Sequence, residues 1–349
     1  MPKLEVIRFH FSTPLHISNE RSDYGKGTMM VHSDTLTAAI YFAWNRLGHS
    51  EWIDDDANNT NGLSVSSLFP FTTINNKFIY FLPRPFVPTV PGNNYEADTI
   101  LRKQLKKISW IDWKTFQSLT EGKSTAPKAE NLLGKFQSVE NINPKVTDKI
   151  SNKFLVSQVV PRTAISRTGK EDTTIFYIER FYFKPHAGLY MLAGFNNDDE
   201  RKKLLFAPRL LGEEGIGTDR NIGHGKFTIE TGDEFEIPEL KDATHGINLG
   251  LYCPSDNDEL QQMLNDEHTG YDFIQRGGWL SEPYNNWRKR SIYMFKEGSC
   301  FKLPPQQKPV DRLLVYGKTH DVKPLEVHPA ISHNVWRSGK SIFYPIKIN

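Results

Sequence analysis

The strongest local feature of the sequence is LLGEEGIGTDRNIGHGKF, residues 210–227. It separates a helix expected to end at Gly212 from a strand expected over residues 225–230. Within this segment, the fourteen residues 212–225 include five glycines, which are listed with the other site residues below. Their amides are unobstructed by Cβ atoms and could approach a phosphate, with Arg220 and Lys226 supplying positive charge. Composition alone leaves a phosphate site and a merely flexible connection equally open.

The segments before this loop alternate between strand and helix patterns. Residues 3–11 alternate like a half-buried strand, and apolar residues spaced by three or four from Leu36 to Leu47 predict a helix capped by Ser33 or Asp34. A strand pair is expected at 174–183 and 188–195, and a second helix from Asn197 or Asp198. This order of strand, helix, strand pair, helix and strand is typical of a ferredoxin-like βαββαβ sheet covered on one face.

The rest of the chain suggests an insertion and a second unit. Residues 91–152 are polar and Lys-rich, with one short helical piece at 99–108, and they interrupt the first unit. The first domain is expected at 1–235 and the second at 246–349. Further strand and helix patterns after residue 246 suggest a second, shorter ferredoxin-like unit with an edge strand at 341–346. The predicted fold class is α+β.

Composition excludes several classes of protein. Lys and Arg total 43 and Asp and Glu total 41, so a net charge of +2 requires any nucleic-acid surface to be local. Cys253 and Cys300 form no CxxC pair, and the histidines have no metal-ligand spacing, so no metal or other cofactor is expected. The chain shows no signal peptide and no long apolar run, which predicts a soluble cytoplasmic protein without a membrane partner.

Two further basic segments are candidate nucleic-acid contacts. Residues 161–170 contain three cations and no acid, and Arg162 and Arg167 could hold successive phosphates. Residues 287–290, Trp-Arg-Lys-Arg, combine an aromatic ring with three cations, a composition that suits RNA and a solvated surface equally.

The segment His32-Ser33-Asp34-Thr35 resembles a catalytic triad only superficially, because adjacent residues at a helix start cannot converge on one substrate atom. A capping role is favoured, and the free amides of the helix start would suit a phosphate. His16, His32 and His224 could act as acid and base in metal-independent RNA cleavage if they meet.

Together these motifs resemble a known family. The motifs are residues 32–36 (HSDTL), 81–85 (FLPRP), 161–168 (PRTAISRT) and the loop 212–225. The chain resembles the RAMP superfamily of CRISPR-associated proteins, most closely the family of the fourth subunit of type III-A, Csm-type effector complexes. It departs from that family at Ser166, where an aspartate is frequent.

The resemblance implies a noncatalytic, RNA-binding scaffold for antiviral defence, with two ferredoxin-like domains and no small-molecule substrate. Its partners would be the 5′ repeat-derived tag of the CRISPR RNA, the large polymerase-like subunit and the backbone RAMP subunit. Residues 91–152, with flanks up to Arg167, would form a projecting thumb. The alternatives are a metal-independent repeat-RNA processing endoribonuclease and the equivalent type III-B subunit. The expected RNA-binding residues are His32, Ser33, Asp34, Thr35, Arg162, Arg167, Gly212, Gly215, Gly217, Arg220, Gly223, His224, Gly225 and Lys226.

Overall fold

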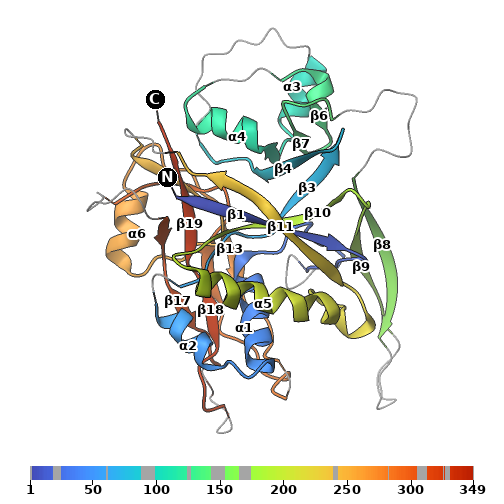
Figure 1. The fold of residues 1–349 in the computed structure, drawn as a ribbon, viewed down its shortest axis with the longest axis vertical. Coiled ribbons are helices and arrows are strands. Elements are labelled where there is room, and N and C mark those ends of the chain that lie inside the picture. The colour runs from blue at the N-terminus through green and yellow to red at the C-terminus, as the bar shows by residue number, and fades with distance from the viewer. Residues whose placement is uncertain are drawn as a thin grey trace.

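A nine-stranded sheet forms the centre of the molecule in the computed structural model (Figure 1). The structure describes residues 2–18, 25–59, 62–87, 99–123, 127–142, 154–164, 174–238, 243–281, 283–304, 313–324, 326 and 331–348. Its central strands follow the order β11-β1-β10-β3-β4, and each is antiparallel to its neighbour. These strands are β1 (Lys3–Phe11), β3 (Phe69–Ile74), β4 (Lys77–Pro83), β10 (Ala187–Gly194) and β11 (Phe227–Glu236), and β2 (Ser64–Val65) pairs with β10.

The central sheet is buried on both faces. In β1, Leu4 and Val6 join one hydrophobic cluster, whereas Ile7 and Phe9 join another. The expectations of a half-buried first strand and of a sheet covered on one face were therefore wrong. The second face is covered because the C-terminal half of the chain packs against it.

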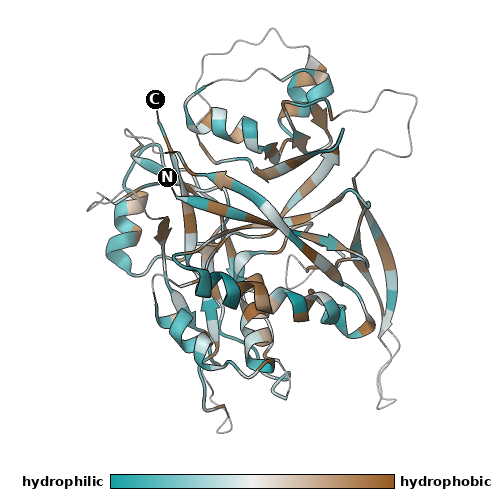
Figure 2. Ribbon diagram, viewed as in Figure 1, coloured by the Kyte–Doolittle hydropathy of each residue, from teal (hydrophilic) through white to brown (hydrophobic). Residues whose placement is uncertain are grey.

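Two helices cover one face of the sheet. They are α1 (Ser33–Arg46) and α5 (Asp198–Glu214), and α2 (Glu51–Asn58) follows α1. Figure 2 shows apolar stretches where α1 and α5 cross, and the Trp44 indole Nε1 donates to the Lys203 carbonyl at 2.9 Å. Asn197 caps α5 by accepting from the Glu200 amide, so the predicted start of the second helix is confirmed. Its predicted end at Gly212 was wrong, because the helix continues to Glu214 and Gly215 follows it with a positive φ.

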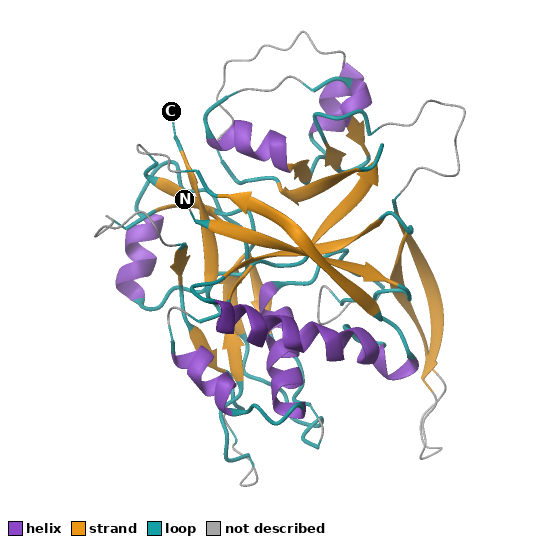
Figure 3. Ribbon diagram, viewed as in Figure 1, coloured by secondary structure: helices purple, strands orange, loops and turns teal. Residues whose placement is uncertain are grey.

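The strand predicted at 174–183 forms, but not with the predicted partner. It is β9 (Thr174–Phe183), which pairs with β8 (Leu155–Ala164) in a separate two-stranded ribbon at the side of the sheet (Figure 3). β10 instead lies between β1 and β3. The predicted pairing was wrong because β3, a strand that contains Pro70, occupies the place beside β10.

The described part of the insertion forms a small lobe on the edge of the sheet. The predicted short helix is confirmed as α3 (Thr99–Leu105), and β5 (Trp110–Asp112) pairs with β4. The other elements are α4 (Trp113–Thr120), η1 (Ala129–Asn131), β6 (Leu132–Leu133) and β7 (Phe136–Gln137). Trp110 is buried, and the Trp113 ring stacks on Phe235 with centroids 3.9 Å apart. Trp110 therefore stabilises the lobe from within, and Trp113 packs the lobe against β11.

The C-terminal half forms a four-stranded sheet of order β15-β12-β19-β16. The C-terminal strand, β19, is therefore internal and not the expected edge strand. The strands of this sheet are β12 (His245–Asn248), β15 (Cys300–Lys302), β16 (Leu314–Tyr316) and β19 (Ser341–Ile346), and α6 (Asn257–Leu264) follows β12. Two separate two-stranded ribbons complete this half. One pairs β13 (Phe273–Arg276) with β14 (Ile292–Phe295), and the other pairs β17 (Thr319–Asp321) with β18 (Trp336–Ser338).

The two sheets share one hydrophobic cluster. Leu4 and Tyr190 of the first sheet and Ile342 and Tyr344 of the second belong to it, and all four are fully buried. The mixed α+β class is confirmed. Within the described residues, no helix is long and apolar enough to span a membrane.

Candidate nucleic-acid interface

The start of α1 is capped differently from the prediction. His32 is the N-cap residue, without a side-chain capping bond, so neither Ser33 nor Asp34 caps the helix. The Ser33 amide donates to Ser67 Oγ at 2.8 Å, and Ser33 Oγ accepts from the Leu251 amide at 2.9 Å. A hydroxyl from a distant segment thus supplies the cap, while Ser33 bonds the C-terminal half.

Asp34 is the centre of a buried ion cluster. Its carboxylate accepts from Arg276 Nε at 2.9 Å and Nη2 at 3.0 Å, and from Arg337 Nη1 at 2.8 Å. The Asp34 side chain is only 2% exposed. Burial alone would raise its pKa, but the two guanidinium groups hold the pKa well below its usual range. Asp34 is therefore ionised and joins α1 to β13 and β18.

His32 also has an internal partner. Its Nδ1 lies 2.8 Å from Glu297 Oε1, and both side chains are buried. Burial opposes ionisation of Glu297, but the His32 ring and the Ser67 hydroxyl that bonds the carboxylate keep the pKa of Glu297 below its usual value. His32, Ser33 and Asp34 each have a different partner, so they form no triad. Of the four residues 32–35, only Thr35 lines the cavity described below.

We expect Ser67→Ala to lower the free energy of unfolding by about 1–3 kcal/mol, because it leaves the buried Ser33 amide without an acceptor and removes a donor to the buried Glu297 carboxylate. Urea denaturation of the full chain measures this change. Ser12→Ala is the control, because that exposed hydroxyl makes one long bond of 3.3 Å. Equal stability of Ser67→Ala and the unmodified chain would contradict the capping role.

Four of the five glycines of the loop are required by close backbone contacts. A Cβ atom would lie 2.4 Å from the Phe227 carbonyl oxygen at Gly212, 2.2 Å from that of His224 at Gly215 and 2.6 Å from that of His16 at Gly217. At Gly225 it would lie 1.9 Å from the Ile216 carbonyl oxygen. Gly215, Gly217, Gly223 and Gly225 also have positive φ, which favours glycine.

Many of the loop amides already have internal acceptors. The Gly225 amide donates to the Pro14 carbonyl at 2.9 Å, the Thr218 amide to His16 at 3.1 Å, and the Lys226 amide to Thr13 Oγ1 at 2.8 Å. The loop is therefore a folded turn fastened to residues 13–16. It is neither a flexible connection nor a row of open amides.

Asp219 connects the loop to the β8–β9 ribbon. Its Oδ2 lies 3.2 Å from Arg162 Nη1 and 3.3 Å from Arg180 Nη2. His224 lies in the same region, where burial and the nearby Arg180 charge lower its pKa. Arg162 thus has a structural partner while its side chain stays 33% exposed. Arg167, its predicted companion, lies outside the described residues.

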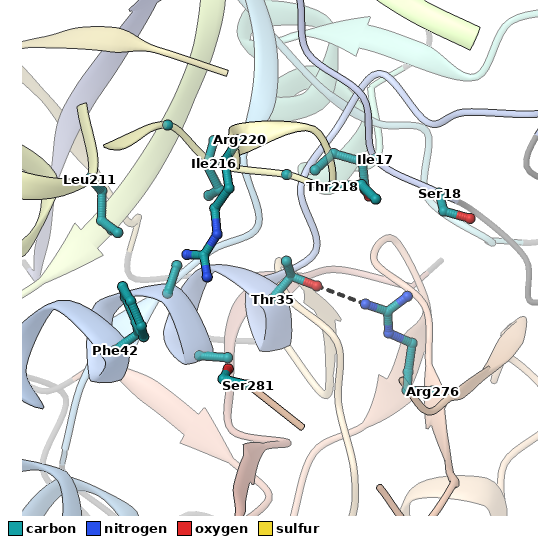
Figure 4. Close-up of a pocket in the computed structure, with 14 residues that line it drawn as sticks. Ile17, Ser18, Thr35, Phe42, Leu211, Ile216, Thr218, Arg220, Arg276 and Ser281 are labelled. Carbon is teal, nitrogen blue, oxygen red and sulfur yellow. Dashed lines mark hydrogen bonds between the residues drawn. The ribbon is translucent and has the colours of Figure 1, made fainter. Parts of the chain in front are cut away.

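A cavity of about 310 Å³ lies between α1 and the glycine-rich loop (Figure 4). Four predicted residues line it, namely Thr35, Gly215, Gly217 and Arg220. The Arg220 guanidinium, from η2 (Arg220–Ile222), lies 4.7 Å from the centroid of the Phe42 ring. On the opposite side, Arg276 donates to Thr35 Oγ1 at 2.8 Å, as the dashed line shows.

The sequence prediction missed Phe42, Arg276 and Ser281, which complete the cavity. Two guanidinium groups, an aromatic ring and several hydroxyls converge there, and histidine, cysteine and carboxylate side chains are absent from the described lining. Guanidinium groups bind phosphates, and bases stack on aromatic rings. The arrangement therefore suits a nucleotide unit better than proton-transfer chemistry.

Comparisons with known proteins place the chain in a family. Residues 8–228 match the family model described as RAMP superfamily, and residues 241–346 match the model described as CRISPR Csm4 C-terminal domain. Two proteins described as CRISPR system Cms protein Csm4 are similar in sequence. The Methanocaldococcus jannaschii protein is 24% identical over 81% of this chain and 83% of its own length, and the Mycobacterium tuberculosis protein 25% identical over 81% and 85%.

Solved structures show the same fold. A chain of the Csm3-Csm4 subcomplex of a type III-A CRISPR-Cas interference complex has a TM-score of 0.64 and 20% identity, with 99% of this chain and 100% of that chain covered. A chain of a Csm1-Csm4 cassette in complex with cA4 has a TM-score of 0.61 and 17% identity, with 100% and 98% covered.

The RAMP match covers more than half of the chain, and the chain belongs to the RAMP superfamily. Within that superfamily, the C-terminal match and the similar sequences identify a Csm4-like subunit. The resemblance inferred from the sequence motifs is confirmed.

Proposed function

We propose that this chain is the RNA-binding scaffold subunit of a type III-A, Csm-type CRISPR effector complex, and that it holds the 5′ repeat-derived tag of the CRISPR RNA. The observation that carries the proposal is the convergence of Arg220 and Arg276 on one cavity beside Phe42. Proteins recognise single-stranded RNA through phosphate contacts and by stacking splayed bases on aromatic or guanidinium planes. The cavity brings these groups together.

The size of the cavity supports one nucleotide as its occupant. A volume of about 310 Å³ is near the lower end of the range for small-molecule sites.

The two arginines of the cavity differ in whether a carboxylate already pairs with them. Arg276 is bonded to Asp34, whereas Arg220 takes part in none of the ion pairs among the described residues. Arg220 is therefore the cation best able to neutralise an incoming phosphate.

We propose a ferredoxin-like unit in the N-terminal half. The strand order β11-β1-β10-β3, with α1 after β1 and α5 between β10 and β11, is the order of a βαββαβ sheet in which β3 and β10 are the middle pair. We assign the thumb to the β8–β9 ribbon, because it stands apart from the sheet, whereas the described part of residues 91–152 packs on the sheet edge (Figure 1).

The proposed protein partners are the large polymerase-like subunit and a backbone RAMP subunit. Similar chains occur in a Csm1-Csm4 cassette and in a Csm3-Csm4 subcomplex, and the matches span almost all of this chain. Apolar side chains on the ribbon suit protein or RNA contact, since Val159 is 54% exposed, Ile175 63% and Tyr177 56%.

We further propose that the subunit is not an enzyme. Metal-independent RNA cleavage needs a histidine or another proton-transfer group beside the scissile phosphate. His32 is buried against Glu297, and His224 lies beside the Arg162–Asp219–Arg180 cluster. Cleavage of repeat RNA by the purified chain in EDTA, abolished by His224→Ala, would contradict this proposal.

We expect Arg220→Ala to weaken binding of a single-stranded RNA that carries the repeat-derived 5′ sequence by about tenfold and to reduce the salt dependence of binding. Fluorescence anisotropy of the full chain at two or more salt concentrations measures both effects. Lys202→Ala is the matched control, because that cation is 70% exposed on α5 and does not line the cavity. An unchanged affinity and salt slope for Arg220→Ala would contradict the proposed site.

A further inference from the structure

An exposed tryptophan lies next to the cavity in the C-terminal half. Arg276 and Ser281, which lie three residues before and two residues after this tryptophan in the chain, both line the cavity. Trp279 lies between them in the chain and is 51% exposed. The half-exposed indole presents an aromatic surface on which a nucleic-acid base could stack.

A cation–π contact and backbone hydrogen bonds with residues 287–289 hold Trp279 in place. The Arg288 guanidinium lies 4.4 Å from the centroid of the Trp279 ring, and the two residues form a backbone bridge. The Leu280 amide donates to the Trp287 carbonyl at 2.9 Å, and the Lys289 amide to Gly278 at 2.9 Å. Leu280 is buried, which fixes the segment against the core. The indole is therefore a preorganised surface.

The surroundings of Trp279 are basic. Residues 276–290 contain four cations and a single acid, Glu282. Burial is the main cause that lowers the pKa of Lys289 to about 8, and the neighbouring Arg337 charge adds to it. Asp34, the carboxylate facing this group, is already bonded to two arginines. The excess of basic residues around Trp279 therefore favours an anionic partner over an apolar one.

We propose that Trp279, supported by Arg288, is a stacking site for the RNA base next to the nucleotide in the cavity. This inference rests on the proposed function, and it extends the RNA path from the glycine-rich loop onto the C-terminal half. Stacking on an indole tolerates any base, because every base has a π-face. The site would therefore add affinity without sequence preference.

The test uses the full chain and a single-stranded RNA of the repeat-derived 5′ sequence, with 2-aminopurine placed at successive positions. We expect Trp279→Leu to bind about tenfold more weakly and to lose the fluorescence quenching at one position. Trp279→Tyr, which keeps an aromatic ring, should retain most of the affinity and the quenching. Phe206→Ala is the control, because Phe206 is 41% exposed on α5 and does not line the cavity.

The outcomes separate this inference from the proposed function. If Trp279→Leu binds RNA normally while Arg220→Ala does not, the stacking site is wrong and the proposed function stands. If the unmodified chain binds no RNA, both fail. If Trp279→Leu keeps its RNA affinity but copurifies less well with another protein subunit, the surface is a protein contact and the inference is overturned.

Discussion

Asp34→Asn is expected to lower the free energy of unfolding by about 3–5 kcal/mol, the largest effect of a single side chain that we predict. The substitution keeps the shape of the side chain but removes the charge that Arg276 and Arg337 share. Both guanidinium groups then stay largely buried without an anion. Urea denaturation of the full chain, followed by circular dichroism, measures the change.

The matched control is Asp198→Asn on α5. Its carboxylate pairs with Lys202, both side chains are 70% exposed, and such surface pairs contribute little. A loss at Asp34 no larger than at Asp198 would show that the buried cluster does not hold the two halves together.

The same cluster predicts a pH dependence. The pKa of Asp34 is lower in the folded chain than in the unfolded chain, so its contribution is fully present above the unfolded value of about 3.9. It is lost as the pH falls through the folded value. The stability difference between the unmodified chain and Asp34→Asn should therefore shrink only at acidic pH, and a difference that shrank at alkaline pH would contradict the assignment.

Gly225→Ala is expected to destabilise the chain by about 3 kcal/mol. Its φ of +73° already disfavours an alanine by about 1–2 kcal/mol. In addition, the new Cβ would lie 1.9 Å from the Ile216 carbonyl oxygen, so the turn must open. Opening it weakens the bonds from Gly225 to Pro14 and from Ile216 to Gly225. Thermal and urea unfolding measure the loss, and RNA affinity should fall with it because the turn forms one wall of the cavity.

Gly223→Ala separates the cost of a positive φ from the cost of a steric clash at the new Cβ. Gly223 has a similar φ of +85°, but a Cβ there would meet nothing within 4 Å. We expect a loss of about 1 kcal/mol. Equal losses at Gly223 and Gly225 would mean that the close packing of the turn contributes nothing to stability.

Much of the fold could be predicted because local patterns are strong. Apolar spacing predicts α1, the caps Asn197 or Asp198 predict the start of α5, and alternation predicts β1. β11 follows the glycine-rich loop, as expected. Strand pairing was harder, because proximity along the chain favoured β9 as the partner of β10. β3 takes that place, and it was missed since Pro70 is atypical of an internal strand.

Only the wall of the cavity formed by the start of α1 and the glycine-rich loop could be predicted from the sequence. Thr35, Gly215, Gly217 and Arg220 lie in recognisable motifs and do line the cavity. Arg276 carries no such signal, because it is a single cation in a short strand and its partner Asp34 lies 242 residues away. The sequence also could not show whether the amides of the glycine-rich loop are free to bind phosphate or are bonded within the chain. That depends on tertiary contacts, such as the bond from the Gly225 amide to the Pro14 carbonyl.

The separation of the cavity walls along the chain has a consequence for synthesis. Thr35 and Arg276 bond across 241 residues, so the opposing wall is translated long after α1 and the glycine-rich loop. A growing chain therefore has the loop but no complete cavity until its C-terminal half has been made and has docked. On the proposed function, a nucleotide would enter the cavity only after the whole subunit has been made and has folded.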